Sequence, residues 1–142
     1  MAKNKRIITD QIFKAYLNCK YKSYLKFHNH TGHKTDYEIL QERLDKKYRL
    51  AAQMKLKSHY LKDDVLHISS ITLAKLRMGK NVILDTVISG NGLQASYDSL
   101  KKCPEGSKVA SFSYEPVSFC RHKRISRIDK LLLAFRSVVL AS

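Results

Sequence analysis

Apolar residues in the first part of the chain recur every three to four positions, the spacing that places side chains on one face of a helix. Thr9 can cap a first helix that runs to about His28, and Thr35 through Glu38 fits the capping box of a second that continues to about Leu61. The expected buried faces are Ile12, Phe13, Tyr16, Leu17, Tyr21, Tyr24, Leu25 and His28 in the first helix, and Tyr37, Leu40, Leu44, Tyr48, Ala51 and Ala52 in the second. Between the two helices, Gly32 can adopt the positive φ that ends a helix.

The pattern changes toward strands in the second half of the chain. Gly90-Asn91-Gly92 is a turn sequence, so the strands on either side of it should pair antiparallel. The expected elements are a strand at 64–69, a helix at 70–78, strands at 81–89, 93–103 and 109–121, and a helix at 124–140. The sequence therefore predicts a single α/β domain over residues 1–142, in which N-terminal helices pack on a three-stranded antiparallel meander closed by a C-terminal helix.

The net charge of the chain indicates what kind of partner it binds. The 142 residues include 27 Lys and Arg against 12 Asp and Glu, which gives a formal net charge of +15. Such an excess repels itself unless something anionic lies alongside, and nucleic acid is the commonest such partner. A solvated basic surface and an anionic membrane surface are the alternatives. The residues expected to contact phosphates are Lys14, Lys22 and Lys26 on the first helix and Arg121, Lys123, Arg124 and Arg127 where the last strand meets the last helix.

The cysteines and the apolar stretches indicate in which cellular compartment the protein is expected. Cys19, Cys103 and Cys120 are odd in number and contain no Cys-x-x-Cys pair, so they predict reduced thiols rather than disulfides or a zinc site. No charged region followed by a long apolar run opens the chain, and the most apolar stretch, Leu131 to Ala141, is too short to span a bilayer. The expectation is a cytoplasmic protein without a membrane partner.

Four segments of the chain carry a resemblance to a known family. They are Ile8 to Phe13 with Tyr16 to Leu25, Gly92 to Leu100, Tyr114 to Cys120, and Asp129 to Phe135. In this order they resemble the RecB-like nucleases of the PD-(D/E)XK superfamily, which include CRISPR-associated exonucleases and domains attached to helicases. The resemblance implies an α/β nuclease fold, DNA as the favoured nucleic acid, Mg²⁺ as the cofactor of an active site, and Asp98 as its metal-binding carboxylate.

The chain departs from the family pattern where the chemistry would sit. A Glu-x-Lys motif would place a carboxylate and an ammonium on one face of a strand beside Asp98, but these positions hold Ser118 and Cys120. Glu115 is the only nearby carboxylate, and it would join Asp98 only through a bulge or a shift in register. Asp98 and Glu115 are therefore the candidate catalytic and metal-binding residues, and whether the protein is an enzyme stays open.

Other departures concern the cofactor and the end of the chain. The family's histidine on the second helix is matched by Tyr48, and the cysteines of its iron–sulfur members have no counterpart near Ser142, so an iron–sulfur cluster is not expected. The strand that follows the last helix in the family is also missing. We therefore expect a C-terminally truncated domain whose exposed edge is covered by a partner protein or by a second copy of the chain.

Taken together, these patterns predict a nucleic-acid-binding protein on a RecB-like nuclease scaffold with degenerate catalysis. Two alternatives remain open from the sequence. One is an active Mg²⁺-dependent DNA exonuclease that uses Asp98 and Glu115. The other is a basic RNA-binding module unrelated to nucleases, which exposed aromatic residues beside the basic stripe would favour.

Overall fold

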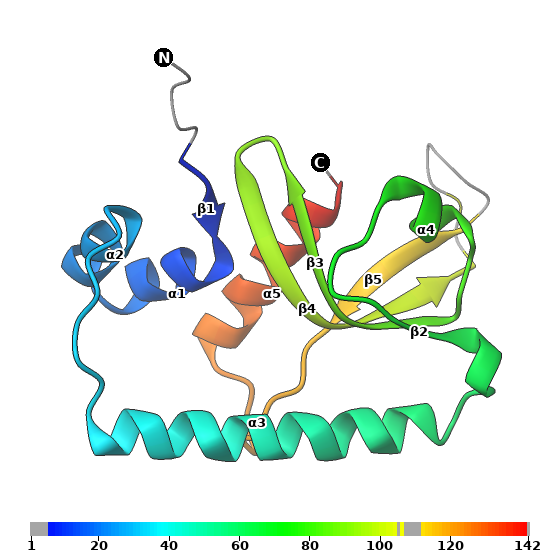
Figure 1. The fold of residues 1–142 in the computed structure, drawn as a ribbon, viewed down its shortest axis with the longest axis horizontal. Helices are drawn as coiled ribbons and strands as arrows, with labels where there is room; N and C mark the ends of the chain where they lie inside the picture. Colours follow the sequence, from blue (N-terminus) through cyan, green and yellow to red (C-terminus); the bar gives the residue numbers. More distant parts are fainter. Residues whose placement is uncertain (1–5, 105, 107–111, 142) are drawn as a thin grey trace.

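The computed structural model describes residues 6–104, 106 and 112–141, and its elements follow the expected alternation of helices and strands (Figure 1). In chain order they are β1 (Ile8–Thr9), α1 (Asp10–Asn18), α2 (Lys20–Phe27), α3 (Asp36–Lys57), a 3-10 turn η1 (Lys62–Asp64), β2 (Val65–His67), α4 (Leu73–Arg77), β3 (Val82–Gly90), β4 (Leu93–Cys103), β5 (Ser113–Val117) and α5 (Arg127–Ala141). The α/β class is confirmed. None of the described helices is both long and apolar enough to cross a membrane.

The sheet differs from the predicted meander. Its strands follow the order β1-β4-β3-β2, and β5 pairs with the second half of β4. The β3–β4 and β4–β5 pairs are antiparallel, but β1 joins β4 and β2 joins β3 in parallel. The prediction of a three-stranded antiparallel meander is therefore wrong. It did not include β1, and it left the strand predicted at 64–69, which is β2, outside the sheet; both add parallel pairings and make a mixed five-stranded sheet.

The turn between β3 and β4 fixes the register of the central hairpin. Asn91 and Gly92 have φ angles of 53° and 79°, and Gly90 pairs with Leu93 across the turn. Two residues with positive φ form the turn type whose twist matches that of the flanking strands, and Asn-Gly is its preferred sequence. The predicted hairpin is thus confirmed, and its register brings Asp98 to the level of Asp85. At that level the ladder is interrupted, since Asp85 has a φ of 50° and no pairing joins it to Asp98.

The core lies between the sheet and the helices on one of its faces. Ile83, Leu100 and Val139 are completely buried, so α5 packs its apolar side directly against the central hairpin. Phe13 of α1 stacks on Phe135 of α5 with ring centroids 4.8 Å apart, which ties the N-terminal helix to the same core. This arrangement sets α1, α5 and the middle of β4 around one common corner.

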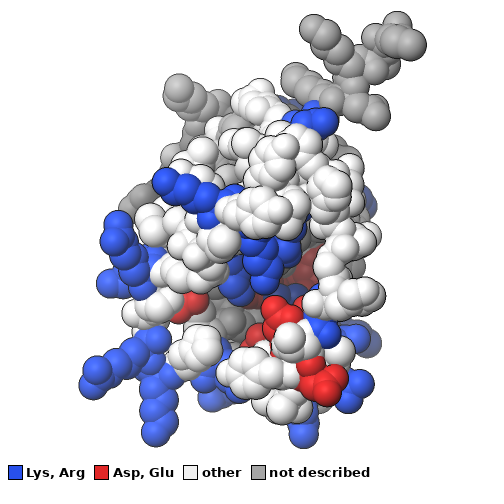
Figure 2. Space-filling view, turned by 90° about the vertical axis from the view of Figure 1, so that its left-hand side faces the viewer, with Lys and Arg blue, Asp and Glu red and all other residues white. Residues whose placement is uncertain are grey.

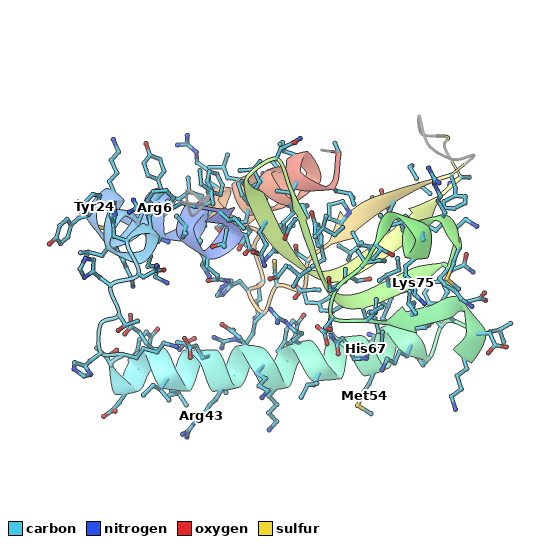
Figure 3. All side chains as sticks on the ribbon, turned by 45° about the horizontal axis from the view of Figure 1, so that its top comes forward. Arg6, Tyr24, Arg43, Met54, His67 and Lys75 are labelled. Carbon is cyan, nitrogen blue, oxygen red and sulfur yellow. The ribbon has the colours of Figure 1, made fainter. Side chains whose placement is uncertain are left out.

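The long helix α3 begins as predicted but does not bury the predicted face. The Thr35–Glu38 capping box is present, which confirms the start of the helix. Tyr37, Leu44 and Tyr48, however, are 69%, 38% and 40% exposed, and Gln53 is the buried residue of the helix. The predicted apolar face was wrong because α3 runs along the edge of the molecule, while α5 packs against the strands of the sheet and α1 packs against α5 (Figure 1). In Figure 3, Arg43 and Met54 point from α3 away from the rest of the protein.

The first helix is also different from its prediction. It divides at Cys19, whose extended backbone separates α1 from α2. The second piece ends near Asn29, which has a φ of 59°, rather than at Gly32. Because of the break the apolar face does not continue, and the predicted buried residues Tyr16, Tyr21 and Tyr24 are exposed.

Candidate functional site

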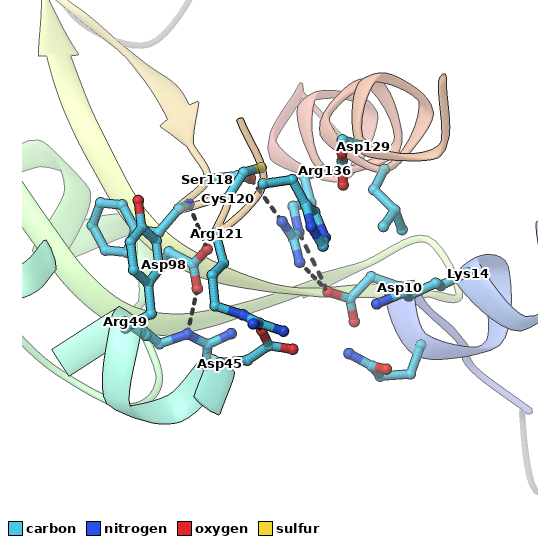
Figure 4. A pocket seen from close by; sticks show the side chains of 15 residues that line it. Asp10, Lys14, Asp45, Arg49, Asp98, Ser118, Cys120, Arg121, Asp129 and Arg136 are labelled. Carbon is cyan, nitrogen blue, oxygen red and sulfur yellow. Dashed lines mark hydrogen bonds and ion pairs between the residues drawn. The ribbon is translucent and has the colours of Figure 1, made fainter. Parts of the chain in front are cut away.

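A polar pocket of about 160 Å³ lies where α1, α3, β4 and α5 meet the loop that follows β5 (Figure 4). Each of these elements contributes side chains to the lining of the pocket. The lining residues that carry charge are Asp10, Lys14, Asp45, Arg49, Asp98, Arg121, Asp129 and Arg136. Acidic and basic side chains therefore share one small pocket, and their pairing determines what the pocket can bind.

Asp98 occupies the middle of β4 and is almost fully buried. One carboxylate oxygen, Oδ1, lies 2.9 Å from Nε of Arg49 on α3, and the other, Oδ2, accepts a hydrogen bond of 3.0 Å from the backbone N–H of Phe119. The Asp98 side chain is 7% exposed, whereas that of Arg49 is 52% exposed. Both oxygens of this carboxylate are thus engaged, and its charge is balanced by an arginine (Figure 4).

Asp10 forms a second acidic centre at the start of α1. Its Oδ2 accepts hydrogen bonds from Nη2 of Arg136 at 3.2 Å and from the backbone N–H of Ser96 at 3.3 Å. The other terminal nitrogen of Arg136, Nη1, donates to the hydroxyl of Ser118 at 2.7 Å. Asp10 is 3% exposed and Arg136 is 13% exposed at the side chain, so this pair is shielded from water. Arg136 therefore links α1, α5 and the segment after β5.

The mouth of the pocket carries further charges. Arg121 donates from Nε to Oδ1 of Asp45 at 2.8 Å and also bonds the side-chain oxygen of Gln41. Hydrogen bonds from the backbone and the hydroxyl of Ser126 lower the pKa of Asp129, and the nearby charges of His122 and Lys14 lower it further. Lys14 and Arg121, which come from the two predicted basic groups, therefore meet at this pocket.

The donor atoms do not fit the Mg²⁺ that the resemblance implies. Mg²⁺ prefers carboxylate oxygens, but the oxygens of Asp98 are bonded to Arg49 and Phe119, and the Ser118 hydroxyl is bonded to Arg136. Within the described residues, no group of three His, Cys, Asp or Glu side chains is arranged to hold a metal ion. A guanidinium beside each buried aspartate supplies the positive charge that a metal would otherwise bring.

The thiol at the predicted lysine position is also unsuited to nucleophilic chemistry. Burial raises the pKa of Cys120, and the negative charges of Asp129 and Asp98 raise it further. A thiol is reactive as the thiolate, and reactive cysteines lie in electropositive surroundings that lower the pKa. Cys120 is therefore a neutral, partly buried packing residue at physiological pH.

The predicted site residues separate into two groups. Asp98, Ser118 and Cys120 all line the pocket. Glu115 does not line it: it is exposed in β5 and lies opposite Lys101 in the ladder. The two candidate metal ligands, Asp98 and Glu115, are thus not brought together around this pocket.

The predicted phosphate-binding residues are spread more widely. Lys14 and Arg121 line the pocket, and Lys22 on α2 lies 3.6 Å from Oε1 of Glu38 on α3. The others, Lys26, Lys123, Arg124 and Arg127, are exposed and lie outside the pocket lining. Figure 2 views the end of the molecule that carries α2. Lys and Arg side chains lie around its outline and near its centre, and acidic side chains gather in its lower half.

The sequence analysis missed Asp10, Arg49 and Arg136 as site residues. Arg136 had a recognisable signal, because it is a charged residue within the apolar stretch of the last helix and a buried guanidinium requires an acidic partner. Asp10 resembled an ordinary acidic residue in the first turn of a helix. Arg49 had no signal, since α3 carries basic residues along much of its second half.

Comparison with protein-family models, with curated proteins and with solved structures finds no match to this chain. The resemblance to RecB-like nucleases therefore stays a prediction from sequence motifs.

Proposed function

We propose that this protein binds nucleic acid, through the charged pocket and the basic residues around it, on a RecB-like scaffold that has lost metal-dependent catalysis. The observation that carries the proposal is the pairing of Asp98, the carboxylate of the implied metal site, with Arg49. An arginine in that place leaves a pocket whose positive groups can face an anion but whose carboxylates are not free to hold Mg²⁺.

The distribution of charge supports a polyanionic partner. The net charge is +15, and Lys14 and Arg121 meet at the pocket from α1 and from the loop after β5. A single phosphate would not balance such an excess, whereas a nucleic acid offers a row of phosphates that can follow the surface from the pocket to Arg124 and Arg127. DNA is favoured over RNA through the resemblance to RecB-like nucleases.

The proposal is tested by titrating a fluorescent DNA with the protein at increasing salt, in EDTA and in Mg²⁺. If about six phosphates are contacted, the affinity should fall by about a thousandfold between low and physiological salt. EDTA should leave it unchanged. Each of the substitutions Lys14→Gln and Arg127→Gln should reduce the slope of log affinity against log salt concentration by about one unit. Lys57→Gln, at the C-terminal end of α3, serves as a control. Binding that does not respond to salt would contradict the proposal.

The loss of catalysis is tested in the same preparation. The unmodified protein should not cleave DNA with Mg²⁺ present, because the ion would find no free pair of carboxylates. Mg²⁺-dependent cleavage that disappears in Asp98→Ala would show that Arg49 leaves Asp98 when metal binds. That result would overturn the loss of catalysis and leave the binding proposal intact.

A second candidate function, an RNA-binding module unrelated to nucleases, is favoured by the exposed tyrosines. Tyr16 and Tyr24 are 50% and 57% exposed, and Nζ of Lys20 lies 5.8 Å from the ring centroid of Tyr16. Aromatic rings beside lysines can stack on the unpaired bases of RNA. A strong preference for single-stranded RNA over DNA in the same titration, lost in Tyr24→Ala, would favour this function.

A further inference from the structure

Three acidic residues of α3 form ion pairs with other parts of the chain, and two of their partners belong to the predicted phosphate-binding set. Asp45 pairs with Arg121 at 2.8 Å, and Glu38 pairs with Lys22 at 3.6 Å. Glu42, the third, pairs with Lys34 at 2.7 Å, just before the start of its own helix. The carboxylates of α3 thus pair with two cations of the predicted phosphate-binding set, and one of them, Arg121, lines the pocket.

The rest of α3 makes few contacts that could hold it in place. Its apolar side chains are largely exposed, and no other described helix or strand lies closely along it. The middle of the helix is attached through Arg49 to the buried Asp98. Apart from this pair, whose aspartate is buried, α3 is held beside the pocket by exposed ion pairs, which are individually weak and are screened by salt.

We infer that α3 acts as an internal competitor of nucleic acid, with the carboxylates of Asp45 and Glu38 occupying the positions that phosphates take on Arg121 and Lys22. This inference rests on the proposed function and adds regulation to the same surface. A carboxylate and a phosphate oxygen accept the same hydrogen bonds from a guanidinium or an ammonium. Nucleic acid that engages Arg121 and Lys22 displaces these two carboxylates from them.

The competition lowers the affinity for nucleic acid but does not prevent it from reaching Arg121 and Lys22. Asp45 is 60% exposed, and Glu38 is 43% exposed, so water and ions reach both pairs. Pairs of this kind open readily, and their loss is compensated when a phosphate takes the place of the carboxylate. Within the described residues no carboxylate of α3 pairs with Lys14, so nucleic acid can make its first contact there.

The test removes the two carboxylates while keeping their shape. The double variant Asp45→Asn and Glu38→Gln should bind DNA about tenfold more tightly than the unmodified protein at low salt. The slope of log affinity against log salt concentration should also become steeper by up to about two units. Two further cations can then contact phosphates, and each contact releases counterions from the DNA. Glutamine is compatible with the capping box of α3, so the helix start is preserved.

The matched control is Glu42→Gln. It removes the same charge from the same helix, but its partner Lys34 lies outside the basic residues that the proposed function uses. This control should change the affinity by less than about twofold. An equal gain in Glu42→Gln and in each single variant would mean that the effect is general repulsion of DNA by negative charge, and it would overturn the inference.

The remaining outcomes separate the two proposals. Salt-dependent binding that does not increase in the double variant overturns the internal competition and leaves nucleic-acid binding intact. No binding to DNA or RNA by any of the proteins overturns the proposed function, and the inference with it. Thermal unfolding by circular dichroism establishes first that the double variant, the two single variants and Glu42→Gln are folded.

Discussion

The sheet with α5 and the long helix α3 are held in the molecule by different forces. The sheet and α5 bury Ile83, Leu100 and Val139 completely, and apolar burial stabilises that region. Helix α3 exposes most of its apolar residues and connects to the rest through Arg49 and Asp45. A region held by apolar packing keeps its geometry in salt and in the presence of a polyanion, whereas a region held by exposed ion pairs responds to both.

The largest expected effect concerns apolar burial. Leu100→Ala should lower the free energy of unfolding by about 2–5 kcal/mol, because it opens a cavity under β4 where Leu100 is fully buried. Leu50→Ala on α3, where the side chain is 53% exposed, should change it by less than about 0.5 kcal/mol. Urea unfolding followed by circular dichroism measures both. A similar cost at the two leucines would mean that α3 is packed against the protein in solution.

A smaller effect is expected at the two arginine–aspartate pairs. Arg136→Met should cost about 3 kcal/mol, because it leaves the Asp10 charge without a cation in a shielded place. Arg49→Met should cost less, about 1 kcal/mol, because the Arg49 side chain is 52% exposed and water can reach the Asp98 carboxylate where the guanidinium was. Urea unfolding of the two variants gives the comparison. Equal costs would indicate that both pairs are equally screened and that α3 is as firmly attached as α5.

The smallest effect concerns the start of α5, where Ser126 and Asp129 exchange hydrogen bonds as a capping box. Asp129→Asn should lower the free energy of unfolding by about 1 kcal/mol at pH 7. The pKa of Asp129 is lowered in the folded state, so its contribution is complete above the ordinary carboxyl pKa and is lost as the pH falls through the lowered folded-state pKa. Urea unfolding at neutral and acidic pH checks this, and a difference independent of pH would contradict it.

Local signals in the sequence predicted the elements whose structure is decided locally. The Thr35–Glu38 capping box and the Asn91–Gly92 turn act within four residues, and both are confirmed. The short strand β1 was not predicted, because its two residues are held by β4, far away in sequence. The burial of α3 was wrongly predicted because periodicity indicates that a helix has an apolar face, without indicating whether another element covers it.

The site was only partly predictable for a similar reason. The sequence motifs brought attention to Asp98 and to Ser118, and both line the pocket. The partners that decide the chemistry, Arg49 and Arg136, come from helices far away along the chain. Which of many basic residues meets a given aspartate depends on packing between elements, and no spacing rule contains that information.

The Asp10–Arg136 pair also has a consequence for how the molecule is made. The two residues are 126 positions apart, so this contact cannot form until the ribosome has synthesised almost all of the described chain. The β3–β4 hairpin, which joins neighbouring segments through a two-residue turn, can form much earlier. The pocket is therefore assembled last, and a nascent chain displays its basic N-terminal helices before the pocket exists.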